Sequence, residues 1–180
     1  MPNVITVFRI LIAPFFFTLL LYYTPSKDGL RLWAFGLFLT ASFTDALDGL
    51  VARLRKEVTQ LGRFLDPLAD KLLLLSGFLG ILFAKGFPLI PPLWVIVAIV
   101  FRDVVILGGL IALFVSGAPI EVRPNLLGKF TTGLQMATMA SLLLLLPISA
   151  LLWYSTAVLT MISGLVYVVR EMKRLKTLNS

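Results

Sequence analysis

The sequence predicts an all-α integral membrane protein whose six transmembrane helices form one domain over residues 1–180, with both termini in the cytoplasm. Hydrophobic residues make up 59% of the chain and charged residues only 14%, whereas soluble domains carry about 25% charged residues. The mean hydropathy is +0.99. A membrane-spanning helix needs about 20 apolar residues, so 180 residues accommodate six such helices with short connections and little else.

A turn separates the first two expected spans. The first runs from about Val4 to Tyr23 and is closed by turn residues at 24–29. It carries Arg9 within the apolar run and lacks a small-residue cleavage site, so we expect a first span rather than a removed signal peptide. The second span, from about Leu30 to Arg53, becomes acidic only in its last turns.

A proline places the start of the third span. Pro67 is tolerated in a first helical turn, whose N–H groups lack partners inside the helix, and is disfavoured further in. We therefore expect this helix to begin at Gly62–Leu65 and to end near Ala84. Asp66 and Asp70 then lie in its opening turns.

Proline-containing turns separate the last three spans. A turn ending in the proline cluster 88–92 precedes the fourth span, expected from about Pro92 to Val115. The connection 116–125 leads to the fifth span, from about Leu126 to Leu146. A tight uncharged turn then leads to the sixth span, which ends near Arg170 and is followed by a basic tail.

The basic residues predict the orientation, because cytoplasmic loops carry an excess of Lys and Arg. Three lie near the odd-to-even turns: Lys27, Arg31 and Lys85. Ten lie near the even-to-odd turns and in the tail: Arg53, Arg55, Lys56, Arg63, Arg123, Lys129, Arg170, Lys173, Arg174 and Lys176. Both termini, and the ends of spans two and three that meet in the basic loop, should therefore face the cytoplasm.

The residue types that are missing restrict the chemistry. The chain has no cysteine and no histidine, which excludes disulfides, thiolate nucleophiles and zinc sites of the Cys/His type. The net charge of +7 is attributed to basic loops beside anionic lipid headgroups. We therefore do not expect nucleic acid as a partner.

Four carboxylates stand in or beside the apolar spans: Asp45, Asp48, Asp66 and Asp70. Each would cost about 2.5 to 3.5 kcal/mol at the bilayer centre, so the cluster needs a cationic partner. Helical spacing places the first pair on one stripe with Gly49 and Ala52, and the second pair on a stripe of the next helix. The small residues leave space for a ligand beside the carboxylates.

Carboxylates alone favour hard cations, Mg²⁺ or Mn²⁺, over zinc. Four of them carry enough charge to balance two such ions, and a two-metal site stabilises the oxygens of a phosphoryl-type displacement. Arg53, at the end of the acidic stripe, is placed to meet a phosphate. The pattern predicts phosphate-ester chemistry at the membrane surface.

The fixed spacing adds a family resemblance. The chain reads Asp45, two residues, Asp48, Gly49, two residues, Ala52, Arg53, eight residues, Gly62, three residues, Asp66, three residues, Asp70. This arrangement resembles the signature of the CDP-alcohol phosphotransferase family at every fixed position and every gap. The six-span layout extends the resemblance over the whole chain.

The resemblance implies an enzyme that transfers the phosphatidyl group of CDP-diacylglycerol to an alcohol and releases CMP. It implies that the four aspartates hold the two metals, and that Asp70 also takes the proton of the attacking hydroxyl, with Asp66 as the alternative base. The implied contacts with the CDP-lipid are Thr6, Gly49, Ala52, Arg53 and Gly62. A homodimer in a bacterial-type inner or plasma membrane is implied as well.

The acceptor alcohol depends on other residues. Asn3, Thr6 and Arg9 resemble the first-helix pattern of phosphatidylglycerophosphate synthases and the related cardiolipin synthases, and the residues Gly128, Lys129, Thr132 and Gln135 resemble their fifth-span pattern. An anionic acceptor such as glycerol 3-phosphate needs a cationic pocket, which Arg102, Arg123 and Lys129 are expected to supply.

The fourth span departs from the phosphatidylglycerophosphate synthase pattern, and this departure favours phosphatidylglycerol as the acceptor. The glycerophosphate enzymes carry Arg-Glu in span four with a second arginine two turns later, whereas this chain has Arg102-Asp103 and Leu110 at those places. Arg-Asp is more similar to the cardiolipin synthases, whose acceptor is phosphatidylglycerol. Serine and inositol phosphate are the remaining acceptors that the motif allows.

The same residues could instead have a purely structural role. Arg102 and Asp103 point about 100 degrees apart on a helix, so we do not expect them to pair with each other, and each would instead satisfy a neighbouring helix. Asn3, Thr6 and Arg9 would cap and snorkel at the membrane surface, and Arg123 and Lys129 would serve topology alone. The rival from another class is a divalent-cation transporter, because intramembrane carboxylates also line ion paths.

Overall fold

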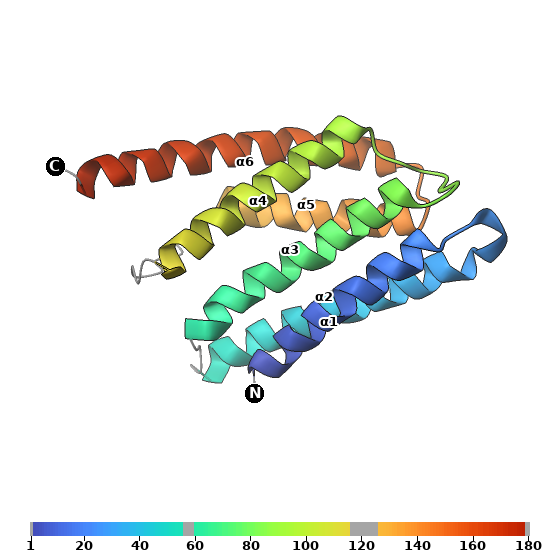
Figure 1. Cartoon of the computed structure of the whole chain (residues 1–180), viewed down its shortest axis with the longest axis horizontal. Helices are drawn as coiled ribbons and strands as arrows, with labels where there is room; N and C mark the ends of the chain where they lie inside the picture. Colours follow the sequence, from blue (N-terminus) through green and yellow to red (C-terminus); the bar gives the residue numbers. More distant parts are fainter. Residues whose placement is uncertain (1, 56–59, 116–125, 179–180) are drawn as a thin grey trace. The chain divides into compact units, whose positions relative to one another are not determined.

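The computed structural model describes the backbone of residues 2–55, 60–115 and 126–178. Side chains are described for 6–44, for 65–111 apart from Pro67 and Leu110, and for 126–167. These parts contain six α-helices, one short 3₁₀ turn and no strand (Figure 1). The elements are α1 (Pro2–Leu21), η1 (Pro25–Lys27), α2 (Gly29–Arg55), α3 (Gln60–Phe83), α4 (Leu93–Val115), α5 (Leu126–Leu143) and α6 (Ser149–Leu178). The predicted all-α class and its six helices are confirmed.

Helices α3 and α6 each differ from the prediction at one end. Helix α3 begins at Gln60, so Pro67 is its eighth residue and lies beyond the first turn, where it was predicted to be. Proline at this place removes one N–H bond of the helix ladder. Helix α6 continues past Arg170 to Leu178, so the residues predicted as a basic tail extend the helix.

Helix α5 ends three residues earlier than predicted because the chain turns left-handed before Pro147. Leu145 has φ 55°, and the N–H of Leu146 donates to the carbonyl of Ser141 at 2.9 Å. The N–H of Leu145 donates to the carbonyl of Leu142 at 3.1 Å. This bond pair is the Schellman arrangement, with leucine at the position that usually carries glycine.

The chain divides into two compact units. Unit 1 comprises residues 1–91 and 139–149, and unit 2 comprises 92–138 and 150–180. Unit 1 therefore contains α1, α2, α3 and the last turn of α5, whereas unit 2 contains α4, most of α5 and nearly all of α6. One domain over 1–180 stays a prediction.

In unit 1, α1 lies beside both α2 and α3 (Figure 1). Thr6 contacts Asp66, and Phe16 and Leu20 lie beside Gly77 and Gly80 of α3. Because contacts keep nearly the same offset from one end to the other, α1 and α3 run parallel. A Cβ added to Gly80 would lie 2.8 Å from the Leu20 Cβ, so glycine is what allows the two helices to approach this closely.

In unit 2, polar side chains join the helices from inside. Thr138 of α5 and Thr156 of α6 share a hydrogen bond of 2.7 Å. Among the described residues of this unit, the buried polar and charged ones are Arg102, Asp103, Thr131, Gln135, Thr138, Thr156, Thr160 and Ser163. Polar contacts between helices are typical of bundles that have lipid rather than water outside them, because lipid provides little hydrophobic drive for helix association.

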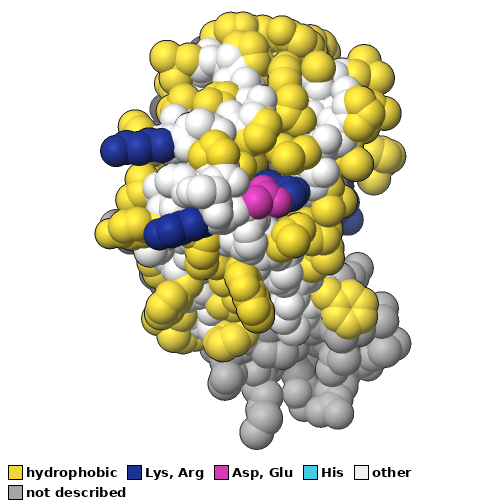
Figure 2. Space-filling view, turned by 90° about the vertical axis from the view of Figure 1, so that its right-hand side faces the viewer, with side chains coloured by type: hydrophobic (Ala, Val, Ile, Leu, Met, Phe, Trp, Pro, Cys, Tyr) yellow, Lys and Arg dark blue, Asp and Glu magenta, His cyan; other side chains and the backbone are white. Residues whose placement is uncertain are grey.

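Large apolar side chains cover much of the outer surface. The face in Figure 2 is mainly hydrophobic, with scattered charged side chains. Exposed examples include Phe15, Trp33, Phe101 and Phe130. Among the described residues, one stretch, Ser149–Tyr167, is both long and apolar enough to cross a membrane by length and composition, and Thr6–Leu21 is apolar but shorter. The predicted set of six spans is thus supported at one helix and stays a prediction at the others.

An ion pair holds the connection between α1 and α2. Arg31 donates from Nε and Nη2 to the two oxygens of Asp28 at 2.7 and 2.6 Å, and a third nitrogen reaches the carbonyl of Leu143. The hydrogen bonds from Arg31 hold the pKa of the Asp28 carboxyl below its usual range, and the positive charge of Arg31 adds to this.

This pair predicts a pH dependence. Since the folded pKa of Asp28 lies below the unfolded one, its contribution to stability is fully present above the unfolded pKa and is lost as the pH falls through the folded pKa. Asp28→Asn should therefore lower Tm at pH 6, and the two melting temperatures should converge as the pH falls below about 4. Thermal unfolding in detergent across this range measures it, and a difference that stays constant with pH would contradict it.

Candidate functional site

Two of the predicted metal ligands meet α1 in unit 1. Asp66 and Asp70 lie one turn apart on α3, so their side chains share a face of the helix. The hydroxyl of Thr6 donates to Asp66 Oδ1 at 2.6 Å. Arg9 donates from Nη1 to Asp70 Oδ1, and its Nη2 lies 3.8 Å from Asp66 Oδ1. The structure therefore brings Thr6, Arg9, Asp66 and Asp70 together.

Arg9 is buried between the helices rather than directed outward. Its side chain is 1% exposed, whereas those of Asp66 and Asp70 are 50% and 23% exposed. A buried guanidinium needs a charged partner because it has lost its water, and both carboxylates supply one. The alternative that Thr6 and Arg9 only cap the helix and snorkel to the surface is wrong.

The remaining residues of the motif lie on described helices, but their side chains are outside the described residues. These are Asp45, Asp48, Gly49, Ala52 and Arg53 on α2 and Gly62 on α3. Within the described part of the chain no group of three or more acidic residues gathers closely enough to hold a metal ion. The meeting of the two acidic stripes therefore stays a prediction.

The pair on α3 fits a hard divalent cation by its donor chemistry. Every described contact of Asp66 falls on Oδ1, and a carboxylate can accept at both of its oxygens. Mg²⁺ and Mn²⁺ prefer oxygen ligands, and these two carboxylates offer them on one face of α3. Asp66 and Asp70 are thus suited to supply half of a two-metal site.

Arg102 is buried in unit 2, on α4. Its Nη1 lies 2.8 Å from Asp103 Oδ1, and its Nη2 donates to Ser163 Oγ on α6 at 3.0 Å. Arg102 and Asp103 therefore do pair, and the expectation that adjacent residues would point too far apart was wrong. The reason is side-chain length, since an arginine can curl back to a neighbour although the Cβ directions differ. The contact with Ser163 agrees with the interpretation that Arg102 satisfies a neighbouring helix.

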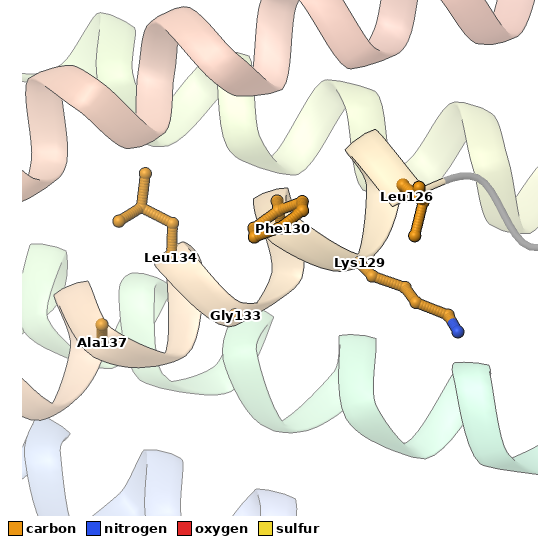
Figure 3. A pocket seen from close by; sticks show the side chains of 6 residues that line it. All are labelled: Leu126, Lys129, Phe130, Gly133, Leu134 and Ala137. Atoms are coloured by element: carbon orange, nitrogen blue, oxygen red, sulfur yellow. The ribbon is translucent and has the colours of Figure 1, made fainter.

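Lys129 is exposed and lines a groove on α5 of unit 2. The groove has a volume of about 440 Å³ and is otherwise lined by Leu126, Phe130, Gly133, Leu134 and Ala137. Figure 3 shows Lys129 directed away from Leu134 and Ala137, so the ammonium stands at one end of an apolar surface. Arg123, the third expected acceptor residue, lies outside the described residues.

Sequence reasoning missed two features of this site. The spacing of Thr6 and Arg9 marked them as candidate residues, but it did not predict that they face the carboxylates of α3. Lys71 follows Asp70 on α3 and is 7% exposed, so a second buried cation lies next to the site in sequence. A lysine within an apolar run was the available signal, because a charge that cannot reach water needs partners.

Comparison with known proteins agrees with the motif. The sequence profile described as CDP-alcohol phosphatidyltransferase matches residues 1–168. A CDP-diacylglycerol–glycerol-3-phosphate 3-phosphatidyltransferase of Bacillus subtilis is 33% identical, covering 99% of this chain and 98% of that protein. A probable phosphatidylglycerophosphate synthase of Mycobacterium tuberculosis is 31% identical, covering 96% and 82%. A probable cardiolipin synthase (CMP-forming) of Drosophila melanogaster is 32% identical, covering 94% of this chain and 57% of that protein.

Proposed function

Because the chain belongs to the CDP-alcohol phosphatidyltransferase family, we propose that it transfers a phosphatidyl group from CDP-diacylglycerol to sn-glycerol 3-phosphate, giving phosphatidylglycerophosphate and CMP. The observation that carries the proposal is the pair Asp66 and Asp70, held by Thr6 and Arg9 at the positions where the family motif has its last two aspartates. The relatives from B. subtilis and M. tuberculosis are named for this reaction or its product.

The proposed metal ligands are Asp45, Asp48, Asp66 and Asp70, which would hold two Mg²⁺ or Mn²⁺ ions. Such ions, when bound, polarise the phosphoryl oxygens and stabilise the negative charge on departing CMP. Gly49, Ala52, Arg53, Gly62 and Thr6 are the proposed contacts with the CDP-lipid. Arginine suits this place because its planar fork matches a phosphate.

Asp70 is the proposed general base. It accepts the proton of the attacking hydroxyl as the new oxygen–phosphorus bond forms, and the bond between that phosphorus and the CMP oxygen breaks. A side chain that is 23% exposed remains accessible to a hydroxyl, while Arg9 keeps the carboxyl at a fixed place. Asp66, more exposed at 50%, remains the alternative base.

Phosphatidylglycerol is the second acceptor. The Arg102-Asp103 pair resembles the cardiolipin synthases, and a relative in D. melanogaster carries that name. The apolar groove beside Lys129 also suits an acceptor with acyl chains more than a small soluble one. Glycerol 3-phosphate stays first because a relative that this chain matches over nearly the full length of both proteins carries that name.

The proposed setting is a multi-pass membrane protein with its site at the cytoplasmic surface. Relatives of this family are membrane enzymes, and the exposed apolar side chains of α1, α4 and α6 suit contact with lipid. Six spans, cytoplasmic termini and a homodimer complete the proposal. Accessibility of single cysteines placed at either terminus of this cysteine-free chain would test the topology.

An acceptor panel tests the reaction. Purified protein with Mn²⁺ or Mg²⁺ and CDP-diacylglycerol should release CMP when given glycerol 3-phosphate, and less with phosphatidylglycerol, serine or inositol phosphate. Release only with phosphatidylglycerol would replace the first acceptor by the second. Release with none of them, together with movement of divalent ions into liposomes, would establish the transporter alternative instead.

Lys129→Gln should raise KM for glycerol 3-phosphate about 10-fold, because a hydrogen bond to a charged group contributes about 1.5 kcal/mol or more. The KM for CDP-diacylglycerol should change little. Lys85→Gln removes an exposed lysine from the connection between α3 and α4 and serves as the matched control. An unchanged acceptor KM in Lys129→Gln would assign Lys129 to topology alone.

A further inference from the structure

We propose that Arg9 and Thr6 of α1 are positioning residues that hold the carboxylates of Asp66 and Asp70 in a fixed orientation toward the divalent cations. This inference rests on the proposed function, and it adds residues outside the aspartate motif to the metal site. Neither residue is required to touch a cation or the reacting phosphorus in this role. For Thr6 the role is separate from the CDP-lipid contact proposed above.

Thr6 and Arg9 contact individual oxygen atoms of the two carboxylates. Thr6 Oγ1 donates to Asp66 Oδ1 at 2.6 Å, and Arg9 Nη2 lies 3.8 Å from that same oxygen. Arg9 Nη1 donates to one oxygen of Asp70. A carboxylate that is fixed through one oxygen loses its freedom to rotate, so the second oxygen of Asp66 points in a defined direction.

Thr6 and Arg9, which together form a clamp on the two carboxylates, are buried and suitably shaped for this role. Thr6 is fully buried and the Arg9 side chain is 1% exposed, so neither exchanges its carboxylate partner for water. The planar guanidinium reaches two carboxylates one helical turn apart from two of its nitrogens. A lysine ammonium has the same charge but lacks this rigid fork.

The close packing of α1 on α3 fixes the position of Thr6 and Arg9. The same parallel register that brings Thr6 to Asp66 and Arg9 to Asp70 continues through Phe16 beside Gly77 and Leu20 beside Gly80. The clamp is therefore built on two closely packed helices rather than on a loop. Sites supported in this way hold their ligands in a narrow range of geometry.

Mn²⁺ binding, measured by the electron paramagnetic resonance signal of the free ion, separates positioning from a purely structural role. Arg9→Met should lower Mn²⁺ affinity about 10- to 100-fold, as loss of outer-shell partners does at other metal sites. Arg9→Lys should remain weakened because it keeps the charge without the fork. CMP release should fall in the same order.

Two further comparisons control for folding. Thr6→Val should weaken Mn²⁺ binding whereas Thr6→Ser, which restores the hydroxyl, should bind like the wild type. This pair decides the question even if the Arg9 variants unfold. Arg31→Met removes another arginine–aspartate pair of unit 1 and should lower Tm with unchanged Mn²⁺ affinity.

The inference fails if Arg9→Met lowers Tm but binds Mn²⁺ like the wild type, or if Thr6→Val and Thr6→Ser bind it equally well. Failure of the proposed function looks different, because the wild-type protein itself would then release no CMP with any acceptor, whether or not it binds Mn²⁺. A wild type that does both, with variants that differ from it only in Tm, overturns the clamp and leaves the proposed function standing.

Discussion

Asp70→Asn is expected to abolish CMP release while leaving the binding of CDP-diacylglycerol largely in place. Loss of a general base lowers turnover by about 10²- to 10⁴-fold, and the same change removes one charge from the proposed metal site. The amide oxygen of asparagine can still accept the hydrogen bond from Arg9. The fold should therefore survive, with a drop in stability below the roughly 3 to 5 kcal/mol that an unpaired buried charge would cost.

The measurement is CMP release per protein molecule, together with binding of the nucleotide-lipid and the melting temperature. Asp28→Asn is the matched control, because Asp28 also accepts hydrogen bonds from an arginine in unit 1 but lies in the connection between α1 and α2. It should turn over like the wild type. Near-normal turnover by Asp70→Asn would remove Asp70 as the base and move that role to Asp66.

The parts of the fold that could be predicted are those controlled by local sequence. Apolar runs separated by proline and glycine are direct signals of helices and turns, and most helix ends were placed within a few residues. The end of α6 was not, since this helix continues past Arg170 to Leu178. The end of α5 was placed three residues too late, because a leucine occupies the left-handed position at Leu145. No glycine marked that turn in the sequence.

Contacts between distant helices were the parts that local sequence could not supply. The motif predicted that Asp66 and Asp70 act together, and their spacing on one helix was sufficient for that. It did not predict that Arg9, about 60 residues earlier in the chain, is their partner, because helical periodicity assigns a face to a residue but not the helix opposite it.

Side-chain reach was a second source of error. Arg102 and Asp103 were expected not to pair because their Cβ directions differ, but Cβ directions describe short side chains well and long ones poorly. In the structure the arginine contacts both its neighbour and Ser163 of α6. To predict the partners of an arginine in an apolar helix, every oxygen within reach of its extended side chain should therefore be considered.

Glycine spacing on α3 links packing to the site and leads to the second large expected effect. Gly80→Ala should destabilise the protein by about 1 to 3 kcal/mol, the usual range for overpacking. The new Cβ would lie 2.8 Å from the Leu20 Cβ, an atom fixed to the α1 backbone that cannot rotate away. Helix α1 must then move from α3, and Arg9 moves with it.

Turnover should fall with stability, because a displacement of about 1 Å at a catalytic group can reduce the rate about 100-fold. Some of the shift will be absorbed along α1, so we expect about a 10-fold loss of CMP release. Thermal unfolding and CMP release, both measured on purified protein, test the two effects. A stable but inactive variant would place the damage at Arg9 and Asp70 rather than in the fold.

Gly36→Ala provides the matched control with the opposite sign. Gly36 lies within α2 and is exposed, and a Cβ added to it would have no atom within 4 Å. Alanine there should stabilise the helix by about 0.5 to 1 kcal/mol, because it restricts the unfolded chain more than glycine does. If Gly80→Ala raised Tm as Gly36→Ala should, close approach of α1 and α3 would not depend on glycine, and the register that joins Arg9 to Asp70 would need another cause.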